Sequence, residues 1–169
     1  KCKFYRGIEW SSVVPAIKRD SRTLQREDYL RLAHQHRFCL AAPGDFISTP
    51  KISEFVAIGA AGGCIPVLIV PDSDDGPSLM LPYAETLDYC SFAFLVREST
   101  AKSRSMRAVV RRLAKVTAEE AALKHAALKR AYHAFVWRDA GKSSSPSAVD
   151  HILSTACAAA KGLLLRGNA

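Results

Sequence analysis

Residues 37–70 of the chain read RFCLAAPGDFISTPKISEFVAIGAAGGCIPVLIV. This segment contains two short apolar runs, Phe38–Ala42 and Cys64–Val70, with a Gly-Asp loop and a helical pattern over Ile52–Ala61 between them. Continuous apolar runs rich in β-branched residues are typical of strands that a parallel sheet buries on both faces. A Gly-Gly pair ends the helix before the second run. The order of strand, helix and strand predicts a right-handed βαβ unit.

The same alternation extends to both sides of this segment. Upstream, Arg22–Gln35 has apolar positions at helical spacing, and Lys3–Arg6 has the composition of a short strand. Downstream, a polar and turn-rich loop over Pro71–Ser78 is followed by another apolar run at Phe92–Val96. We therefore expect an α/β fold built on a Rossmann-like, doubly wound parallel sheet.

The C-terminal part of the chain favours helices. Ser103–Val116 carries an apolar stripe at helical spacing, while most of its basic residues lie off that stripe; the stripe consists of Met106, Val109, Val110, Leu113 and Val116. A second pattern follows, either separate from the first or continuous with it. It covers Ala118–Trp137, with apolar positions at Leu123, Ala127, Ala131 and Phe135.

A linker divides this region. The run GKSSSPS over Gly141–Ser147 has linker composition, and Ser147 with Asp150 matches a capping box that opens a last helix to about Leu165. The sequence thus predicts an α/β domain over residues 1–140, a linker over 141–147 and a C-terminal helix within 148–169.

Composition sets broad limits on function. The chain has 169 residues, of which 49% are hydrophobic, so it can bury one sizeable core. Its apolar runs are shorter than the roughly 20 residues that span a bilayer, and its first residues lack the apolar core of a signal peptide. Because the chain begins without Met and enters a strand-like segment at once, we expect an excised part of a longer protein. The net charge of +8 favours polyanionic ligands without selecting one.

The cysteines indicate neither a zinc site nor a small disulfide scaffold, because they are widely spaced and form no CxxC pair; they are Cys2, Cys39, Cys64, Cys90 and Cys157. We interpret them as small buried hydrophobic residues. Cys39 and Cys64 lie at neighbouring predicted strands that can bring them together, but the sequence does not by itself predict a bridge.

The central segment also has the organisation of a phosphate site. The strand that ends in Pro-Gly-Asp delivers the chain to the carboxyl edge of the sheet, where open α/β folds bind ligands. A helix beginning near Lys51 offers its positive end to an anion. Lys51 and Glu54 lie three residues apart and so share a helix face, which supplies a cation for phosphate and an acceptor for sugar hydroxyls. This pairing suggests a nucleotide sugar.

Four motifs in order resemble a known family: FCLAAPGD, ST-x-K-I-x-E, GGCIPVLI and LPYAETLDYCSF. Together they are similar to the C-terminal half of the exostosin family of glycosyltransferases, most strongly over Arg37–Val96. The resemblance implies a GT-B fold in which this chain is the half that holds the nucleotide-sugar donor, with a helical tail. It also implies a hexosyl- or pentosyltransferase that inverts the anomeric centre and builds cell-wall or other polysaccharides. Such an enzyme needs no metal and no cofactor beyond its donor, which we expect to be a UDP-sugar.

The resemblance further implies partners and a location. The partners are a nucleotide sugar, a glycan acceptor and an N-terminal acceptor domain that this chain lacks; nucleic acid is not among them. Family members are typically Golgi membrane proteins with a lumenal catalytic part, so an anchor outside this chain would supply the membrane contact. Without the acceptor domain, we expect the chain to be inactive alone.

The family motif maps onto six donor-binding candidates in this chain, which are Gly44, Asp45, Ser48, Thr49, Lys51 and Glu54. The Gly-Asp turn and the Ser or Thr before the helix match the family pattern. Glu54 falls at the acidic position expected to accept hydrogen bonds from the ribose. Lys51 falls where the family usually has Arg at the diphosphate, and Lys offers a point charge in place of a planar fork.

Two insertions also depart from the family pattern. The chain is about four residues longer between Glu54 and Gly63, which corresponds to about one helical turn. The loop between Asp72 and Leu81 is longer as well. These departures fit a divergent enzyme or a degenerate copy without activity.

Other interpretations remain open. Asp45 can simply stabilise a turn, Ser48 or Thr49 can cap the helix, and Glu54 can be a plain surface residue. His34 and His36 end a helix, where they satisfy its dipole. Asp72, Asp74 and Asp75 resemble metal-binding carboxylates, although a Gly-Pro loop explains them equally well.

A catalytic base cannot be assigned from the sequence. An alternative function, outside the enzymes, is that of a basic polyanion-binding module that uses Lys102–Lys115. Nucleic-acid binders usually interleave exposed aromatic residues with basic ones, and this segment contains no aromatic residue.

Overall fold

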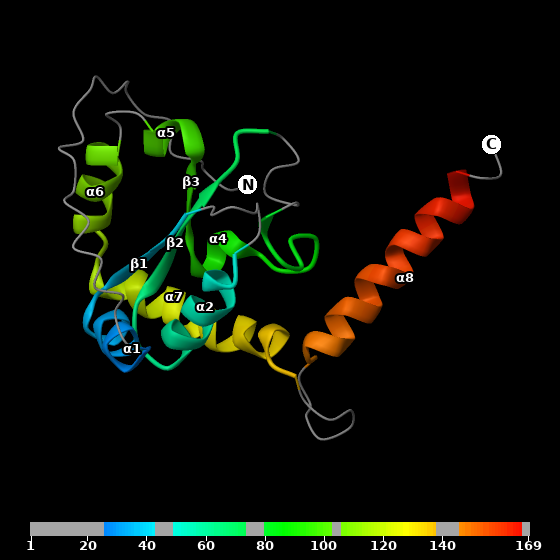
Figure 1. Cartoon of the computed structure of the whole chain (residues 1–169), viewed down its shortest axis with the longest axis horizontal. Coiled ribbons are helices and arrows are strands. Elements are labelled where there is room, and N and C mark those ends of the chain that lie inside the picture. The colour runs from blue at the N-terminus through cyan, green and yellow to red at the C-terminus, as the bar shows by residue number, and fades with distance from the viewer. Residues whose placement is uncertain (1–25, 43–48, 74–79, 103–105, 138–145, 167–169) are drawn as a thin grey trace.

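The computed structural model describes residues 26–42, 49–73, 80–102, 106–137 and 146–166 of the chain. Within these residues, helices surround a three-stranded parallel sheet (Figure 1). The elements are α1 (Arg26–Gln35), β1 (Phe38–Ala41), α2 (Lys51–Ala60), β2 (Ile65–Val70), α4 (Tyr89–Phe92), β3 (Phe94–Arg97), α5 (Glu98–Lys102), α6 (Met106–Ala114), α7 (Ala118–Ala131), the 3-10 helix η1 (Tyr132–Phe135) and α8 (Ala148–Arg166). The predicted strand at Lys3–Arg6 and most of the predicted linker lie outside the described residues.

The sheet has the order β1-β2-β3, with both pairs parallel. The register aligns Leu40 with Val67, and Val67 with Phe94. All six residues of the central strand β2 are buried, as a continuous apolar run requires. The predicted βαβ unit is therefore confirmed, because α2 connects β1 to β2 and each predicted strand lies within one residue of the observed one.

Helices cover both faces of the sheet. On one face, Leu68, Val70 and Leu95 share a core with α2, α4 and α7. On the other face, Val67 and Val96 pack with residues of α6 and of the turn that follows it. This α/β arrangement is compatible with a Rossmann-like fold.

The third strand begins later than its apolar run predicts. Phe92 was expected to open the strand, but it ends the short helix α4, and β3 starts at Phe94. Asp88 is the reason, since its side chain accepts a hydrogen bond from the backbone N–H of Cys90 and caps α4. Phe92 is nonetheless buried, so its apolar character reflects the core and not a strand.

The two predicted C-terminal helices are separate, because Thr117 caps α7 by accepting a hydrogen bond from the backbone N–H of Glu120. Two predicted core positions are wrong: Val110 is 56% exposed and Leu123 is 66% exposed. The adjacent Lys124 is buried in place of Leu123, at 8% exposure. A pattern that counts only apolar residues assigns the wrong face here, because the aliphatic stem of a lysine is also able to enter a core.

Cys39 and Cys64 form a disulfide, a bond that the sequence alone left unpredicted. It joins β1 to the residue just before β2, and its two Cα atoms are 5.5 Å apart. Cys90 is disulfide-bonded as well. Cys157 is exposed and free. The interpretation of the cysteines as small buried hydrophobic residues is therefore wrong for Cys157 and incomplete for the bonded ones.

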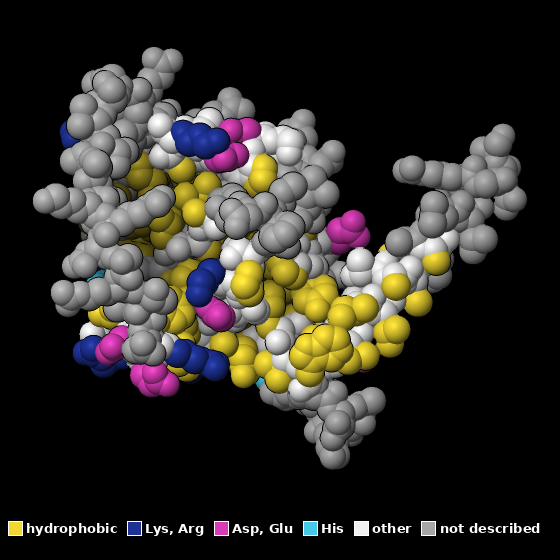
Figure 2. Space-filling view, in the orientation of Figure 1, with side chains coloured by type: hydrophobic (Ala, Val, Ile, Leu, Met, Phe, Trp, Pro, Cys, Tyr) yellow, Lys and Arg dark blue, Asp and Glu magenta, His cyan; other side chains and the backbone are white. Residues whose placement is uncertain are grey.

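The predicted capping box opens α8, since the hydroxyl and backbone N–H of Ser147 both donate to the Asp150 carboxylate. These hydrogen bonds lower the pKa of Asp150. Beyond its first turns, α8 extends away from the body, and apolar side chains continue along it (Figures 1 and 2). No helix in the described ranges is long and apolar enough to cross a membrane.

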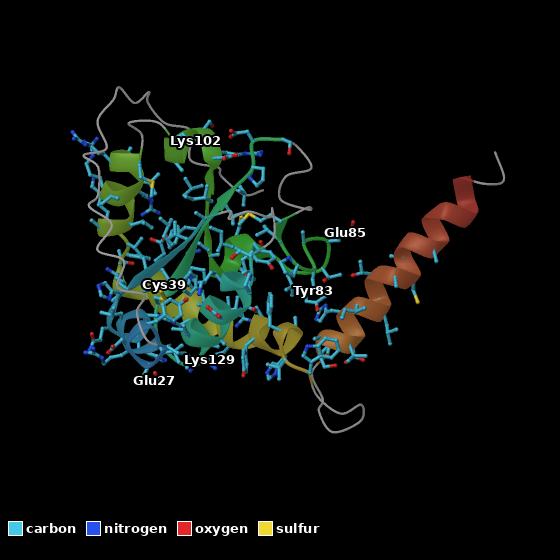
Figure 3. All side chains as sticks on the ribbon, viewed as in Figure 1. Glu27, Cys39, Tyr83, Glu85, Lys102 and Lys129 are labelled. Atoms are coloured by element: carbon cyan, nitrogen blue, oxygen red, sulfur yellow. A yellow bond between two sulfur atoms is a disulfide. The ribbon has the colours of Figure 1, made fainter. Side chains whose placement is uncertain are left out.

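Tyr83 lies between the body and α8 (Figure 3). Its φ of 56° places it in the left-handed region, which is costly for an aromatic residue. Its ring packs against Phe135 and against His151 of α8, with centroids 5.9 Å and 5.3 Å away. The aromatic contacts thus hold a strained backbone at the junction with α8.

Candidate functional site

A pocket of about 550 Å³ lies between the first turns of α1 and α2. Its described lining consists of Arg26, Tyr29, Leu30, Lys51 and Glu54. Because α1 leads into β1 through a short turn, the first turn of α1 lies toward the carboxyl end of β1. The start of α2 lies there too, since α2 follows β1. The pocket therefore occupies the sheet edge at which open α/β folds bind ligands.

Helical spacing explains why these side chains converge. Arg26, Tyr29 and Leu30 lie three or four residues apart and so share one face of α1. Lys51 and Glu54 share one face of the first turn of α2, while the opposite face of that helix is buried in the core. The predicted proximity of Lys51 and Glu54 is confirmed.

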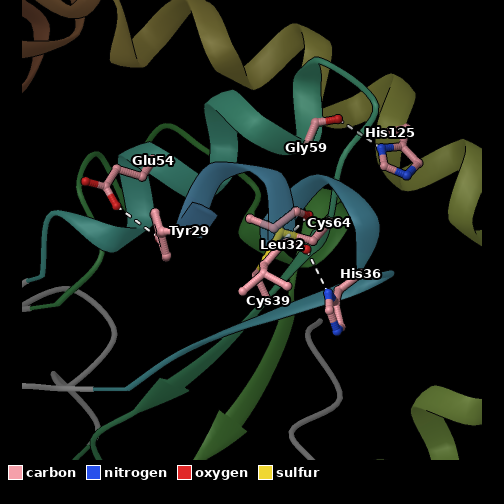
Figure 4. Close-up of a disulfide and its surroundings, with 9 residues drawn as sticks. Tyr29, Leu32, His36, Cys39, Glu54, Gly59, Cys64 and His125 are labelled. Atoms are coloured by element: carbon pink, nitrogen blue, oxygen red, sulfur yellow. Dashed lines mark hydrogen bonds between the residues drawn. A yellow bond between two sulfur atoms is a disulfide. The ribbon is translucent and has the colours of Figure 1, made fainter. Parts of the chain in front are cut away.

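Three of these side chains form one cluster. The Tyr29 hydroxyl donates to Glu54 Oε2 at 3.1 Å, and Lys51 Nζ lies 3.0 Å from the same oxygen. Lys51 Nζ is also 4.4 Å from the centroid of the Tyr29 ring. Figure 4 shows Tyr29 and Glu54 facing one another from α1 and α2. Glu54 Oε1 accepts no hydrogen bond from the residues that the structure describes.

The cluster fixes its own protonation state. The hydrogen bond to Glu54 raises the pKa of Lys51 above its ordinary value, and the Glu54 charge adds to the effect. Burial, with a further contribution from Glu54, raises the pKa of Tyr29. At neutral pH the pocket therefore holds a Lys ammonium and a neutral phenol that donates to Glu54.

The other predicted donor-binding residues are partly visible. Thr49 Oγ1 accepts a hydrogen bond from the Lys51 backbone N–H at 3.4 Å, so Thr49 lies at the start of α2 and contributes to its first turn. Gly44, Asp45 and Ser48 lie outside the described residues, and their roles stay predictions.

Sequence reasoning missed the contribution of α1 to this pocket. The helical pattern predicted over Arg22–Gln35 includes Arg26 and Tyr29, but it assigns neither residue to a site. The sequence did place Arg26 and Tyr29 on one face of the first helix, and Lys51 and Glu54 on one face of the second. What the sequence did not supply was the packing of α1 on α2, which depends on contacts such as that between the Tyr29 and Phe55 rings, 6.3 Å apart.

The carboxylate of Asp72 has a structural role. It accepts hydrogen bonds from the backbone N–H of Ser99 at 3.0 Å and from the Ser99 hydroxyl at 2.8 Å, at the start of α5. Asp74 and Asp75 lie outside the described residues. Within the described ranges, no three His, Cys, Asp or Glu side chains are arranged to hold a metal ion.

The two histidines at the end of α1 were expected to satisfy its dipole. His36 does so, because its Nδ1 lies 2.7 Å from the Leu32 carbonyl oxygen in the last turn of α1 (Figure 4). It therefore has a local partner and lies outside the pocket.

Residues 9–113 match the Exostosin GT47 domain. The chain belongs to the exostosin GT47 family. The three described strands, α2 and the described lining of the pocket all lie within the residues that match this glycosyltransferase family. The resemblance expected from the four sequence motifs is confirmed. Neither the curated proteins nor the solved structures include a match to this chain.

Proposed function

We propose that this exostosin chain is the donor-binding half of an inverting GT-B glycosyltransferase. The enzyme transfers a sugar from a nucleoside-diphosphate sugar, with UDP as the expected nucleotide, to a growing glycan. The observation that carries the proposal is the pocket at the carboxyl edge of the sheet, within the family match. It combines cations with a carboxylate oxygen, Glu54 Oε1, to which no described residue donates a hydrogen bond.

Each part of the donor has a complementary group in this pocket. Glu54 Oε1 is available to accept a hydrogen bond from a ribose hydroxyl. The positive end of α2 and the cations Arg26 and Lys51 favour the diphosphate. During transfer these positive groups would stabilise the charge that develops on the departing nucleotide, which requires no metal.

The acceptor proton needs a separate base. An inverting transfer requires a carboxylate or His that removes the proton of the acceptor hydroxyl as the sugar is displaced. We assign this base to the acceptor domain, which a GT-B enzyme places across the donor site. The chain alone is then expected to bind donor without transferring sugar.

The Cys39–Cys64 disulfide supports a lumenal location, because such bonds persist in oxidising compartments. We propose the Golgi lumen, with a membrane anchor and the acceptor domain outside this chain. A polysaccharide of the cell wall or of the extracellular matrix fits the family and this location.

Thermal unfolding with and without UDP tests the donor site. At a UDP concentration about 100 times Kd, we expect a midpoint about 5 °C higher or more, since ligand binding at that level adds about 2.7 kcal/mol. Glu54→Ala should abolish the shift. Glu27→Ala is the matched control, because Glu27 is an exposed acidic residue of α1 outside the pocket lining. An unchanged midpoint for the wild-type chain at millimolar UDP would refute the proposal.

A second candidate function rests on α6. A cavity of about 530 Å³ there is lined by Arg107 and Arg111 together with Met106 and Val110, which favours an acidic glycan. Under this alternative, the double change Arg107→Gln and Arg111→Gln would weaken binding of a sulfated oligosaccharide, and Glu54→Ala would not. A polyanion-binding module without a donor site would show these effects on oligosaccharide binding, and UDP would not change its unfolding midpoint.

A further inference from the structure

The two cations of the donor pocket differ in how they are paired. Lys51 Nζ lies 3.0 Å from Glu54 Oε2, so these two side chains form a neutral pair, held in place by the Tyr29 ring and hydroxyl. A lysine already bonded to a carboxylate has less attraction for a second anion. Binding a phosphate through Lys51 would require breaking that pair or sharing it.

Arg26 differs from Lys51 in its contacts with the described residues. Arg26 lines the same pocket, and its side chain makes no hydrogen bond or ion pair with the described residues. The nearby acidic residue Asp28 is occupied by Arg31, whose Nη2 lies 2.7 Å from Asp28 Oδ1. Because the charges of Lys51 and Glu54 cancel, Arg26 provides the net positive charge among the described lining residues.

From this contrast we infer that Arg26 is the diphosphate ligand of the pocket and that Lys51 is a positioning residue for Glu54. The inference rests on the proposed donor function. An Arg guanidinium presents a rigid planar fork that matches two phosphate oxygens, which suits a diphosphate better than an ammonium does. Lys51 and Tyr29 both hold Oε2 of Glu54, which leaves Oε1 directed to the ribose.

The division of roles has a direct consequence for affinity. Arg26 should add to the affinity only for ligands that carry phosphate, whereas Lys51 should add to the affinity for any ligand that carries a ribose. Comparing UDP with uridine separates the two, because uridine keeps the ribose and lacks the phosphates.

The experiment measures UDP and uridine binding to the wild-type chain and to three variants by ligand-observed NMR titration. Arg26→Gln should weaken UDP binding about tenfold or more, which is the effect of losing a charge-assisted hydrogen bond. It should leave uridine binding unchanged. Lys51→Gln should weaken the binding of both ligands by similar factors. Arg31→Gln is the matched control, as it removes an α1 arginine that is paired outside the pocket, and it should change neither.

The outcomes separate this inference from the proposed function. If wild-type chain binds UDP and Arg26→Gln binds it equally well, the role of Arg26 is wrong while the donor site stands. If Lys51→Gln weakens UDP alone, Lys51 is the phosphate ligand and the inference fails. If Arg31→Gln weakens UDP as much as Arg26→Gln does, general surface charge explains the effect. If the wild-type chain does not bind UDP, both the inference and the proposed function are refuted.

Discussion

At the scale of single residues, Lys124 illustrates how a charged side chain serves a core. Its Nζ donates to the carbonyl oxygens of Cys90 at 3.1 Å and Ala93 at 3.0 Å, and it lies 4.3 Å from the centroid of the Phe94 ring. Cys90 belongs to α4, and Ala93 lies between α4 and β3. The lysine therefore connects α7 to the junction of α4 and β3.

Replacing Lys124 with Met should destabilise the fold by about 1–3 kcal/mol, because the carbonyls of Cys90 and Ala93 lose the hydrogen bonds that Lys124 donates. The pH dependence gives a second test. Burial lowers the pKa of Lys124 below the ordinary value of 10.5, so the unfolded chain binds more protons between the two pKa values. Wild-type stability should therefore rise with pH across that interval, and the rise should be smaller in Lys124→Met.

Urea unfolding at about pH 8 and about pH 10 measures both effects. Lys129→Met is the control, since Lys129 is an exposed lysine of the same helix. Equal pH dependence in wild type and Lys124→Met would show that the buried ammonium does not govern this part of the stability curve.

Tyr29 acts on the same scale at the pocket between α1 and α2. Tyr29→Phe removes the hydroxyl that donates to Glu54 Oε2 and keeps the ring beneath Lys51. Loss of one hydrogen bond should reduce UDP affinity about threefold to tenfold, with little change in the unfolding midpoint. Calorimetric titration measures the affinity. An unchanged affinity would mean that Lys51 orients Glu54 without help from Tyr29.

At the scale of elements, the packing of α2 on α7 depends on Gly59. A Cβ built at this position would lie 2.7 Å from Leu128 Cδ1 and 2.8 Å from the Cys64 carbonyl oxygen. His125 reinforces the contact, since its Nδ1 lies 2.9 Å from the Gly59 carbonyl oxygen (Figure 4). The close approach of the two helices therefore requires a residue without a side chain.

Gly59→Ala should cost about 1–3 kcal/mol, because the clash includes a backbone atom that cannot rotate away. Chemical denaturation measures the loss, and Ala61→Ser, an exposed change just after the same helix, provides the control. A Gly59→Ala variant as stable as the wild type would mean that α2 and α7 are farther apart than described.

The disulfide is the second device at this scale. It ties β1 to the start of β2 across a separation of 25 residues, and a loop of that size predicts about 3.5 kcal/mol of stabilisation through the unfolded state. The double change Cys39→Ala and Cys64→Ala should lower the urea midpoint accordingly. Cys157→Ser, which removes a free and exposed thiol, should leave it unchanged. Equal midpoints for all three proteins would refute the estimate.

The elements were predictable from the sequence to the extent that local patterns determine them. The apolar run Cys64–Val70 and the box formed by Ser147 and Asp150 were recognised because their signals lie within a few residues. The burial of Lys124 and the Cys39–Cys64 bond were not, because both depend on segments that are distant in sequence. The pocket between α1 and α2 was half predicted for the same reason. Lys51 and Glu54 belong to one helical turn, whereas Arg26 and Tyr29 reach the pocket only through the packing of α1 on α2.

At the scale of the whole molecule, the described contacts between α8 and the body lie near the start of this helix. Ala148 is buried at its start, and His151 contacts both the Tyr83 ring and Thr86, whose Oγ1 lies 3.2 Å from His151 Nδ1. Farther along, the described side chains from Ala156 to Cys157 are exposed. The family match ends well before this helix, at residue 113. We infer that the contacts at the start of α8 stabilise the body and that the distal part of this helix does not.

Truncation after Thr155 should therefore change the free energy of unfolding by less than about 0.5 kcal/mol, as expected for surface changes that remove no buried contact. His151→Ala in the full chain should cost about 1 kcal/mol, because it removes a hydrogen bond and a ring contact at the junction. Urea denaturation of both variants, with UDP titration as a readout of the donor pocket, compares them directly. Because the pocket lies between α1 and α2, UDP affinity should be the same in both. A large loss of stability on truncation would mean that the distal part of α8 packs on the body, and a loss of UDP affinity would mean that it reaches the donor site.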